Sequence, residues 1–145
     1  MGFFRFLHVL GAILLVGNVI VTGLWAHWAI ARREPALDVF AAKAILRADL
    51  WLTLTGGTLL VTAGLVLVRA GGWPWTTPWL AHGAGLLVAS TAVWLAVLLP
   101  DQWRMARHAA AGEADALRRV YRRWAVLGWL DTALLIAALA AMVVR

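Results

Sequence analysis

The sequence predicts an all-α polytopic membrane protein, an antiparallel bundle of four transmembrane helices. Of the 145 residues, 63% are hydrophobic and the mean hydropathy is +0.83, far more apolar than a soluble domain of this length. A spanning helix takes about 20 apolar residues. Four windows are long enough, at about 3–30, 50–68, 79–99 and 124–144. We therefore expect residues 1–145 to form a single transmembrane domain.

The first window is expected to be a retained helix. Its apolar run is longer than the signal-peptide core of about 7–15 residues, and three further spans follow it.

The polar stripe of this first helix is the first sign of a site. At 100° per residue, six residues fall within an arc of about 100°: His8, Gly11, Leu15, Asn18, Thr22 and Trp25. Small and polar residues of a spanning helix pack against other helices, so this stripe should face the bundle.

The connections between the spans predict short turns and helix extensions. The segment before the second span, PALDVFAAKAILRADL, starts with Pro35, which suits a first helical turn, and has no helix breaker. The loop RAGGWPWTTPW contains two Gly and two Pro and predicts a non-helical hairpin connection. Residues 101–123 are interrupted only by Gly112, so helical extensions should project from the membrane there.

Basic residues predict the orientation of the bundle, because Lys and Arg near helix ends stay in the cytoplasm. Ten of them lie in the two longer connections, and three lie on the other side: Arg5, Arg69 and Arg145. We expect both termini outside a bacterial cytoplasmic membrane. The net charge of +6 should face anionic lipid headgroups rather than nucleic acid, since the basic residues flank apolar spans.

The third span carries a histidine followed by small residues on one face, listed as His82, Gly85, Ala89, Ala92 and Ala96. We expect this face to pack tightly or to leave room for a bound group. Both His8 and His82 should lie roughly 5–10 Å from the outer interface, at 1.5 Å per residue. Two imidazoles at one depth can bind haem b or copper, with Gly11, Gly85 and Ala89 lining the space. The alternative is that each histidine only hydrogen-bonds a carbonyl.

Asp131 lies inside the fourth span, in WAVLGWLDTALL, where an unpaired carboxylate is costly. We expect a structural ion pair with Arg47, at the inner end of the second span. Proton transfer by Asp131 is the alternative.

Three segments carry a family resemblance: FLHVLGAILLVGN, LLPDQW and RRWAVLGWLDTALLIAALAAMVVR. They resemble a bacterial family of four-helix predicted integral membrane proteins of unknown function. That family is distantly similar to the CopD-type copper-resistance membrane proteins and the HemJ-type protoporphyrinogen oxidases. In those groups a first-helix histidine is implicated in binding copper or haem b, and His8 matches it. The membrane-embedded lysine of a HemJ-type site has no counterpart, since the only lysine is Lys43 in a cytoplasmic segment.

The sequence leaves three functions open. The first is electron transfer near the outer face by haem b bound between His8 and His82. The second is copper handling by the same two histidines. Copper has few ligands here, since the chain contains no cysteine and its three methionines lie far from the site. The third is a non-catalytic accessory subunit, packing against a larger respiratory or photosynthetic complex or a second copy. No paired carboxylates, phosphate-binding loop or serine nucleophile motif is visible, so an enzyme is the less favoured class.

Overall fold

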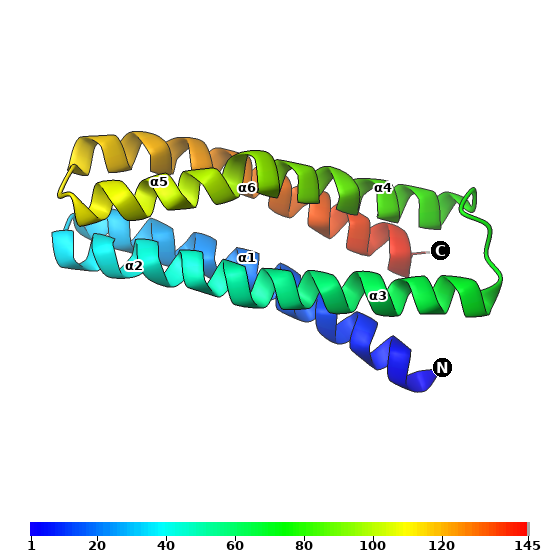
Figure 1. Cartoon of the computed structure of the whole chain (residues 1–145). Helices are drawn as coiled ribbons and strands as arrows, with labels where there is room; N and C mark the ends of the chain where they lie inside the picture. Colours follow the sequence, from blue (N-terminus) through cyan, green and yellow to red (C-terminus); the bar gives the residue numbers. More distant parts are fainter. Residues whose placement is uncertain (145) are drawn as a thin grey trace.

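The computed structural model describes residues 1–144 and contains four long helices that pack as an antiparallel bundle (Figure 1). All four are long and apolar enough to cross a membrane. The first is α1 (Gly2–Arg32). The second is continuous through α2 (Pro35–Ala48), the π-helical turn η1 (Asp49–Thr53) and α3 (Leu54–Gly71). The third joins α4 (Pro78–Val93), the π-helical turn η2 (Trp94–Leu98) and α5 (Leu99–Ala110), and the fourth is α6 (Ala114–Val143). The predicted fold class is confirmed.

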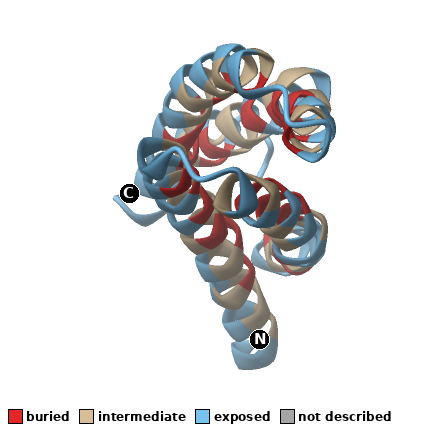
Figure 2. Ribbon diagram, turned by 90° about the vertical axis from the view of Figure 1, so that its left-hand side faces the viewer, coloured by how far each residue is buried: buried red, intermediate tan, exposed pale blue. Residues whose placement is uncertain are grey.

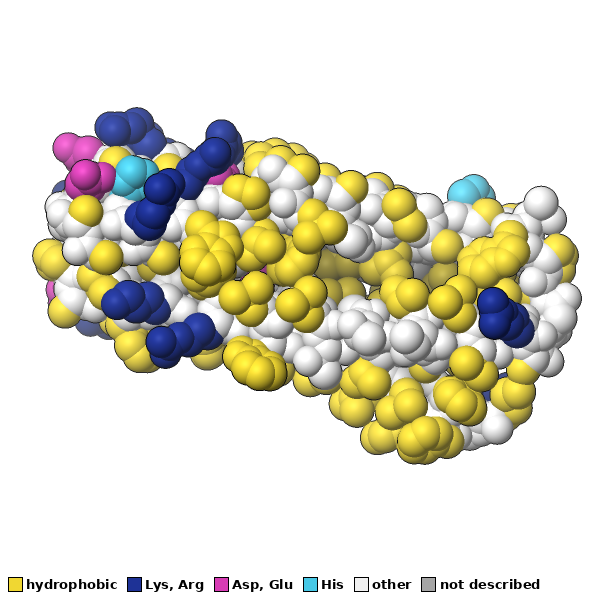
Figure 3. Space-filling view, viewed as in Figure 1, with side chains coloured by type: hydrophobic (Ala, Val, Ile, Leu, Met, Phe, Trp, Pro, Cys, Tyr) yellow, Lys and Arg dark blue, Asp and Glu magenta, His cyan; other side chains and the backbone are white. Residues whose placement is uncertain are grey.

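Proline and left-handed residues set the helix boundaries. Pro35 and Pro78 occupy the first turns of α2 and α4, where the missing N–H costs nothing. The turns that follow α3 and α5 contain Gly72 and Gly112 with φ of +66° and +72°, a conformation that glycine adopts without strain. Both middle helices exceed the roughly 20 residues that cross a bilayer, at 37 and 33 residues. The predicted helix extensions are therefore present, as α2 and α5. Lys and Arg gather mainly at the end of the bundle that α2 and α5 form (Figure 3).

The main apolar core lies in the half of the bundle that contains α2 and α5. A cluster of buried apolar residues there joins α1, α2, η2, α5 and α6, with Ile45 and Met105 almost fully enclosed. In the other half, α1 packs mainly along α3 and α4 along α6. The beginning of α1 extends away from the other helices (Figures 1 and 2). The buried residues lie on the inward faces of the helices (Figure 2).

The stripe on α1 faces the bundle as predicted. Its buried residues are Gly11, Leu15, Asn18, Thr22, Ala26 and Ala29. A Cβ atom at Gly11 would lie 2.5 Å from the backbone nitrogen of Leu60 and 2.7 Å from the carbonyl oxygen of Gly56. This glycine therefore allows α1 and α3 to touch through their backbones. Trp25 is the exception to the predicted stripe, because it is exposed.

The expectation for the third span is wrong about which face is buried. His82, Gly85, Ala89, Ala92 and Ala96 are all exposed, whereas α4 buries Leu80, Gly83 and Ser90. Small residues allow helices to approach closely but do not require it, so this pattern alone does not identify the inward face. Ser90 is the polar residue that the bundle must enclose, and it lies on the opposite side of the helix.

Candidate functional site

Asp49 is the centre of a polar network in the middle of the bundle. Its side chain is 3% exposed and accepts hydrogen bonds from four groups on three of the long helices. Asn18 Nδ2 donates to Oδ1 of Asp49 over 2.6 Å, and Thr53 Oγ1 donates to the same oxygen over 3.4 Å. Trp94 Nε1 donates to Oδ2 over 3.1 Å. The fourth donor is Gln102 Nε2, also to Oδ2. All four donors are neutral.

The two π-helical turns lie at this network. Asp49 begins η1, and Trp94 begins η2 on the neighbouring long helix. A π-helical turn inserts an extra residue into a helix and often marks a functional position. Here one turn carries the acceptor and the other carries a donor to it. Both middle helices therefore depart from regular α-helical hydrogen bonding where the polar network crosses the bundle.

A cavity of about 30 Å³ adjoins Asp49. It lies between α1, η1, η2, α5 and α6, and we call it the chamber. Its walls consist of Val19, Thr22, Gly23, Asp49, Trp94, Leu98, Gln102, Trp124, Ala125, Gly128, Trp129, Asp131 and Thr132. Among these lining residues two are aspartates and none is Lys, Arg or His. The chamber therefore brings two carboxylates together without a balancing positive charge from its own walls.

Asp131 is the second carboxylate of the chamber. It is 2% exposed, and Ser90 of α4, at 3% exposed, is also buried. Its Oδ1 has no hydrogen-bond partner within the described part of the chain. Asp49 lines the same cavity. Two charges in one low-dielectric site are unfavourable, so the arrangement favours one negative charge rather than two.

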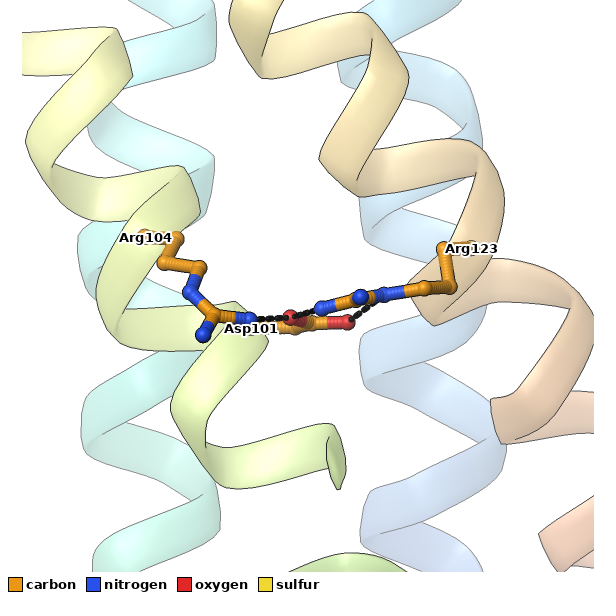
Figure 4. A network of polar contacts seen from close by, with 3 residues as sticks. All are labelled: Asp101, Arg104 and Arg123. Carbon is orange, nitrogen blue, oxygen red and sulfur yellow. Dashed lines mark hydrogen bonds and ion pairs between the residues drawn. The ribbon is translucent and has the colours of Figure 1, made fainter. Parts of the chain in front are cut away.

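A third buried carboxylate follows the chamber toward the basic end of the bundle. Asp101 is 0% exposed and is held by two arginines (Figure 4). Arg104 Nη1 donates over 2.8 Å, and Arg123 donates to both carboxylate oxygens, through Nε over 2.8 Å and through Nη2. Unlike Asp49 and Asp131, Asp101 is therefore neutralised by cations. Its role is to join α5 to α6 beside the chamber.

The structure does not bring His8 and His82 together as ligands of one group. His8 is half-buried against α3, and its Nδ1 lies 2.8 Å from the carbonyl oxygen of Leu60, to which it donates. His82 is exposed on the opposite helix pair, as are Gly85 and Ala89. Gly11 has the backbone of Leu60 directly against it and leaves no space for a flat ring there.

The expected ion pair between Arg47 and Asp131 is not formed among residues 1–144. Arg47 is exposed at the end of α2. A long arginine side chain near a helix end extends its guanidinium group toward water, where the charge stays hydrated. Asp131 instead faces the chamber, which explains how a carboxylate occurs in an apolar span.

Sequence reasoning identified Asn18 and Asp131 but missed Asp49, Gln102 and Trp94 as their neighbours. No sequence-based prediction included Asp49, which lies at the start of the second span. Its signal was the polar stripe on the first span: a buried Asn18 requires a partner on another helix. Which helix supplies that partner depends on how the four helices are arranged around one another.

Residues 3–145 match the model of a family described as predicted integral membrane protein (DUF2269). No curated protein and no solved structure matches the chain.

Proposed function

Since the chain belongs to the DUF2269 family of integral membrane proteins, we propose that it handles protons within the membrane, with Asp49 and Asp131 sharing one exchangeable proton. The observation that carries this proposal is the chamber, which two buried carboxylates line. None of its lining residues, as given above, is Lys, Arg or His. Ionisable groups within a membrane are costly and are typical of ion pathways and proton relays.

The hydrogen bonds assign different roles to the two carboxylates. Asp49 accepts four hydrogen bonds from neutral donors, so both of its carboxyl oxygens have partners. Asp131 has one buried carboxyl oxygen, Oδ1, without a hydrogen-bond partner in the described chain. Paired carboxyl groups in unequal environments divide into a charged member and a protonated member. Asp131 is therefore the residue that holds the shared proton at rest, and Asp49 is the carboxylate that can receive it.

The position of the chamber supports a role in proton uptake and release. Asn18, Asp49 and Asp131 lie near the middle of three helices that are each long enough to cross a bilayer. Asp101, held by Arg104 and Arg123, marks the end of the bundle where charged groups begin. A proton on Asp131 thus lies inside the apolar part of the protein, several turns from either helix end.

Infrared spectroscopy of the purified protein in lipid tests this proposal. A protonated aspartic acid gives a C=O stretching band separate from the carboxylate bands. We expect this band in the parent protein as the pH is lowered below neutral, and its absence from Asp131→Asn at the same pH. The matched control is Asp115→Asn, an exposed aspartate on the same helix, which should retain the band. A spectrum without the band, or a band unchanged in Asp131→Asn, would show that Asp131 carries no proton.

Cofactor binding by His8 is a second candidate. Because Nδ1 of His8 donates to the carbonyl oxygen of Leu60, its Nε2 is the nitrogen with a free lone pair, as in histidines that bind a metal or haem iron. Haem b, or copper, between His8 and His82 would require the exposed His82 to approach α1. An absorption spectrum tests it: His8→Ala and His82→Ala should remove or shift a Soret band, and His27→Ala and His108→Ala should not. A protein that takes up neither haem nor copper would exclude this function.

An accessory-subunit role is supported by exposed tryptophan along the helices. Trp51 is 74% exposed in η1, at the start of the second apolar span, so its side chain can contact a neighbouring protein. A larger complex should then co-purify with the chain in mild detergent. A chain that purifies alone and retains the Asp131 band would favour the proton role.

A further inference from the structure

We infer that a water molecule binds in the chamber and joins Asp131 to Gln102 and Trp124, so that it relays the proton proposed above. Three buried side-chain atoms without a hydrogen-bond partner in the described chain belong to these residues: Gln102 Oε1, Trp124 Nε1 and Asp131 Oδ1. Their residues are 1%, 6% and 2% exposed, and all three line the chamber. Buried polar atoms that find no partner in the protein are typically satisfied by ordered water.

The chemistry of the three atoms matches the hydrogen-bonding capacity of water. The Gln102 amide is oriented by its donation to Asp49, which makes Oε1 an acceptor on the free side. Trp124 Nε1 can only donate. Asp131 accepts when charged and can donate when protonated. A water molecule can donate to Gln102, accept from Trp124 and serve Asp131 in either role.

The same set of atoms disfavours a metal ion or ammonium as the occupant. A cation attracts acceptors only, and the Trp124 N–H would point its positive end toward it. Only a group that both donates and accepts can remain bound while Asp131 gains and loses its proton. The volume of the chamber agrees, since about 30 Å³ exceeds the roughly 10–15 Å³ that one water requires.

This site gives the proton a defined route between the two carboxylates. Asp131 donates its proton to the water oxygen while the water passes one of its own protons to Asp49, which also lines the chamber. The products are a charged Asp131, a protonated Asp49 and an intact water molecule. Atoms and charge therefore balance, and the single negative charge moves from one side of the chamber to the other.

Infrared spectra recorded in H₂¹⁶O and H₂¹⁸O test this inference, which depends on the proposed proton site. A bound water gives an O–H stretching band that shifts with the oxygen isotope, whereas the C=O band of Asp131 does not. We expect this isotope-sensitive band in the parent protein and its loss or shift in Trp124→Phe. Trp103→Phe, at an exposed tryptophan, is the matched control and should leave it unchanged.

The outcomes separate the two claims. An Asp131 C=O band without an isotope-sensitive water band would overturn the bound water and leave the proton site standing. Loss of both bands in the parent protein would overturn both. Replacing choline chloride with sodium or ammonium chloride should change neither band. A shift of the Asp131 band on adding either cation would show that a cation, not water, occupies the chamber.

Discussion

Arg123 on α6 donates hydrogen bonds to both carboxylate oxygens of Asp101 on α5 (Figure 4). The Asp101 side chain is completely buried. A planar guanidinium group fits a carboxylate in this two-point arrangement, which fixes orientation as well as distance. Because Gln102 follows Asp101 directly and donates to Asp49, this pair also holds one wall of the chamber in place.

Arg123→Gln should therefore destabilise the bundle, since it leaves the buried Asp101 with only Arg104 as a charged partner. The Arg123 side chain is 52% exposed whereas Asp101 is fully enclosed, so the cost arises because the buried carboxylate loses hydrogen bonds from a cation. Thermal unfolding in detergent measures the effect. Arg119→Gln makes the same charge change at an exposed site on α6 and should leave the midpoint unchanged; equal losses in the two variants would contradict a specific role of Arg123.

Gly11→Ala should destabilise the protein by about 1–3 kcal/mol, the usual range for overpacking. The added Cβ would meet the backbone of Leu60 at 2.5 Å, and backbone cannot move aside without separating α1 from α3. The measurement is the free energy of unfolding in detergent.

Gly17→Ala is the matched control on the same helix. A Cβ there meets nothing within 4 Å, and alanine favours a helix over glycine by up to about 1 kcal/mol. This variant should be as stable as the parent or slightly more so. If both substitutions were neutral, α1 and α3 would not be in backbone contact.

Asp49→Asn and Asp131→Asn should differ in their effects on stability. Asp49 accepts from four donors, so an amide would turn an N–H group toward at least one of them and cost about 1–3 kcal/mol. Asp131→Asn resembles the protonated acid and should cost less than about 1 kcal/mol. The two free energies of unfolding, measured at neutral pH, check this order. The reverse order would place the proton on Asp49.

Both termini should lie outside the cytoplasmic membrane, because Lys and Arg gather at the other end of the bundle (Figure 3). A periplasmic alkaline phosphatase fused to the C-terminus should be active in a bacterial host. A cytoplasmic reporter fused at the same point should be inactive. The opposite pair of results would reverse the orientation and place the end with Asp101 outside.

The sequence by itself determined the four helices, their connections and the inward stripe of α1. These features depend on local pattern: apolar length sets the spans, Pro35 and Gly112 mark a helix start and a turn, and small and polar residues on α1 need protein neighbours. The same reasoning identified Asp131 as an anomaly, since a carboxylate in an apolar span is costly wherever its partners lie.

Only the tertiary structure decided which groups meet. Asp49 and Asp131 are 82 positions apart along the chain, and nothing in their spacing shows that they line one cavity. The burial of Ser90 rather than the His82 face of α4 also depends on the rotation of that helix. In a membrane both faces of an apolar helix are acceptable to lipid, so rotation is set by the partners that buried polar groups find on neighbouring helices.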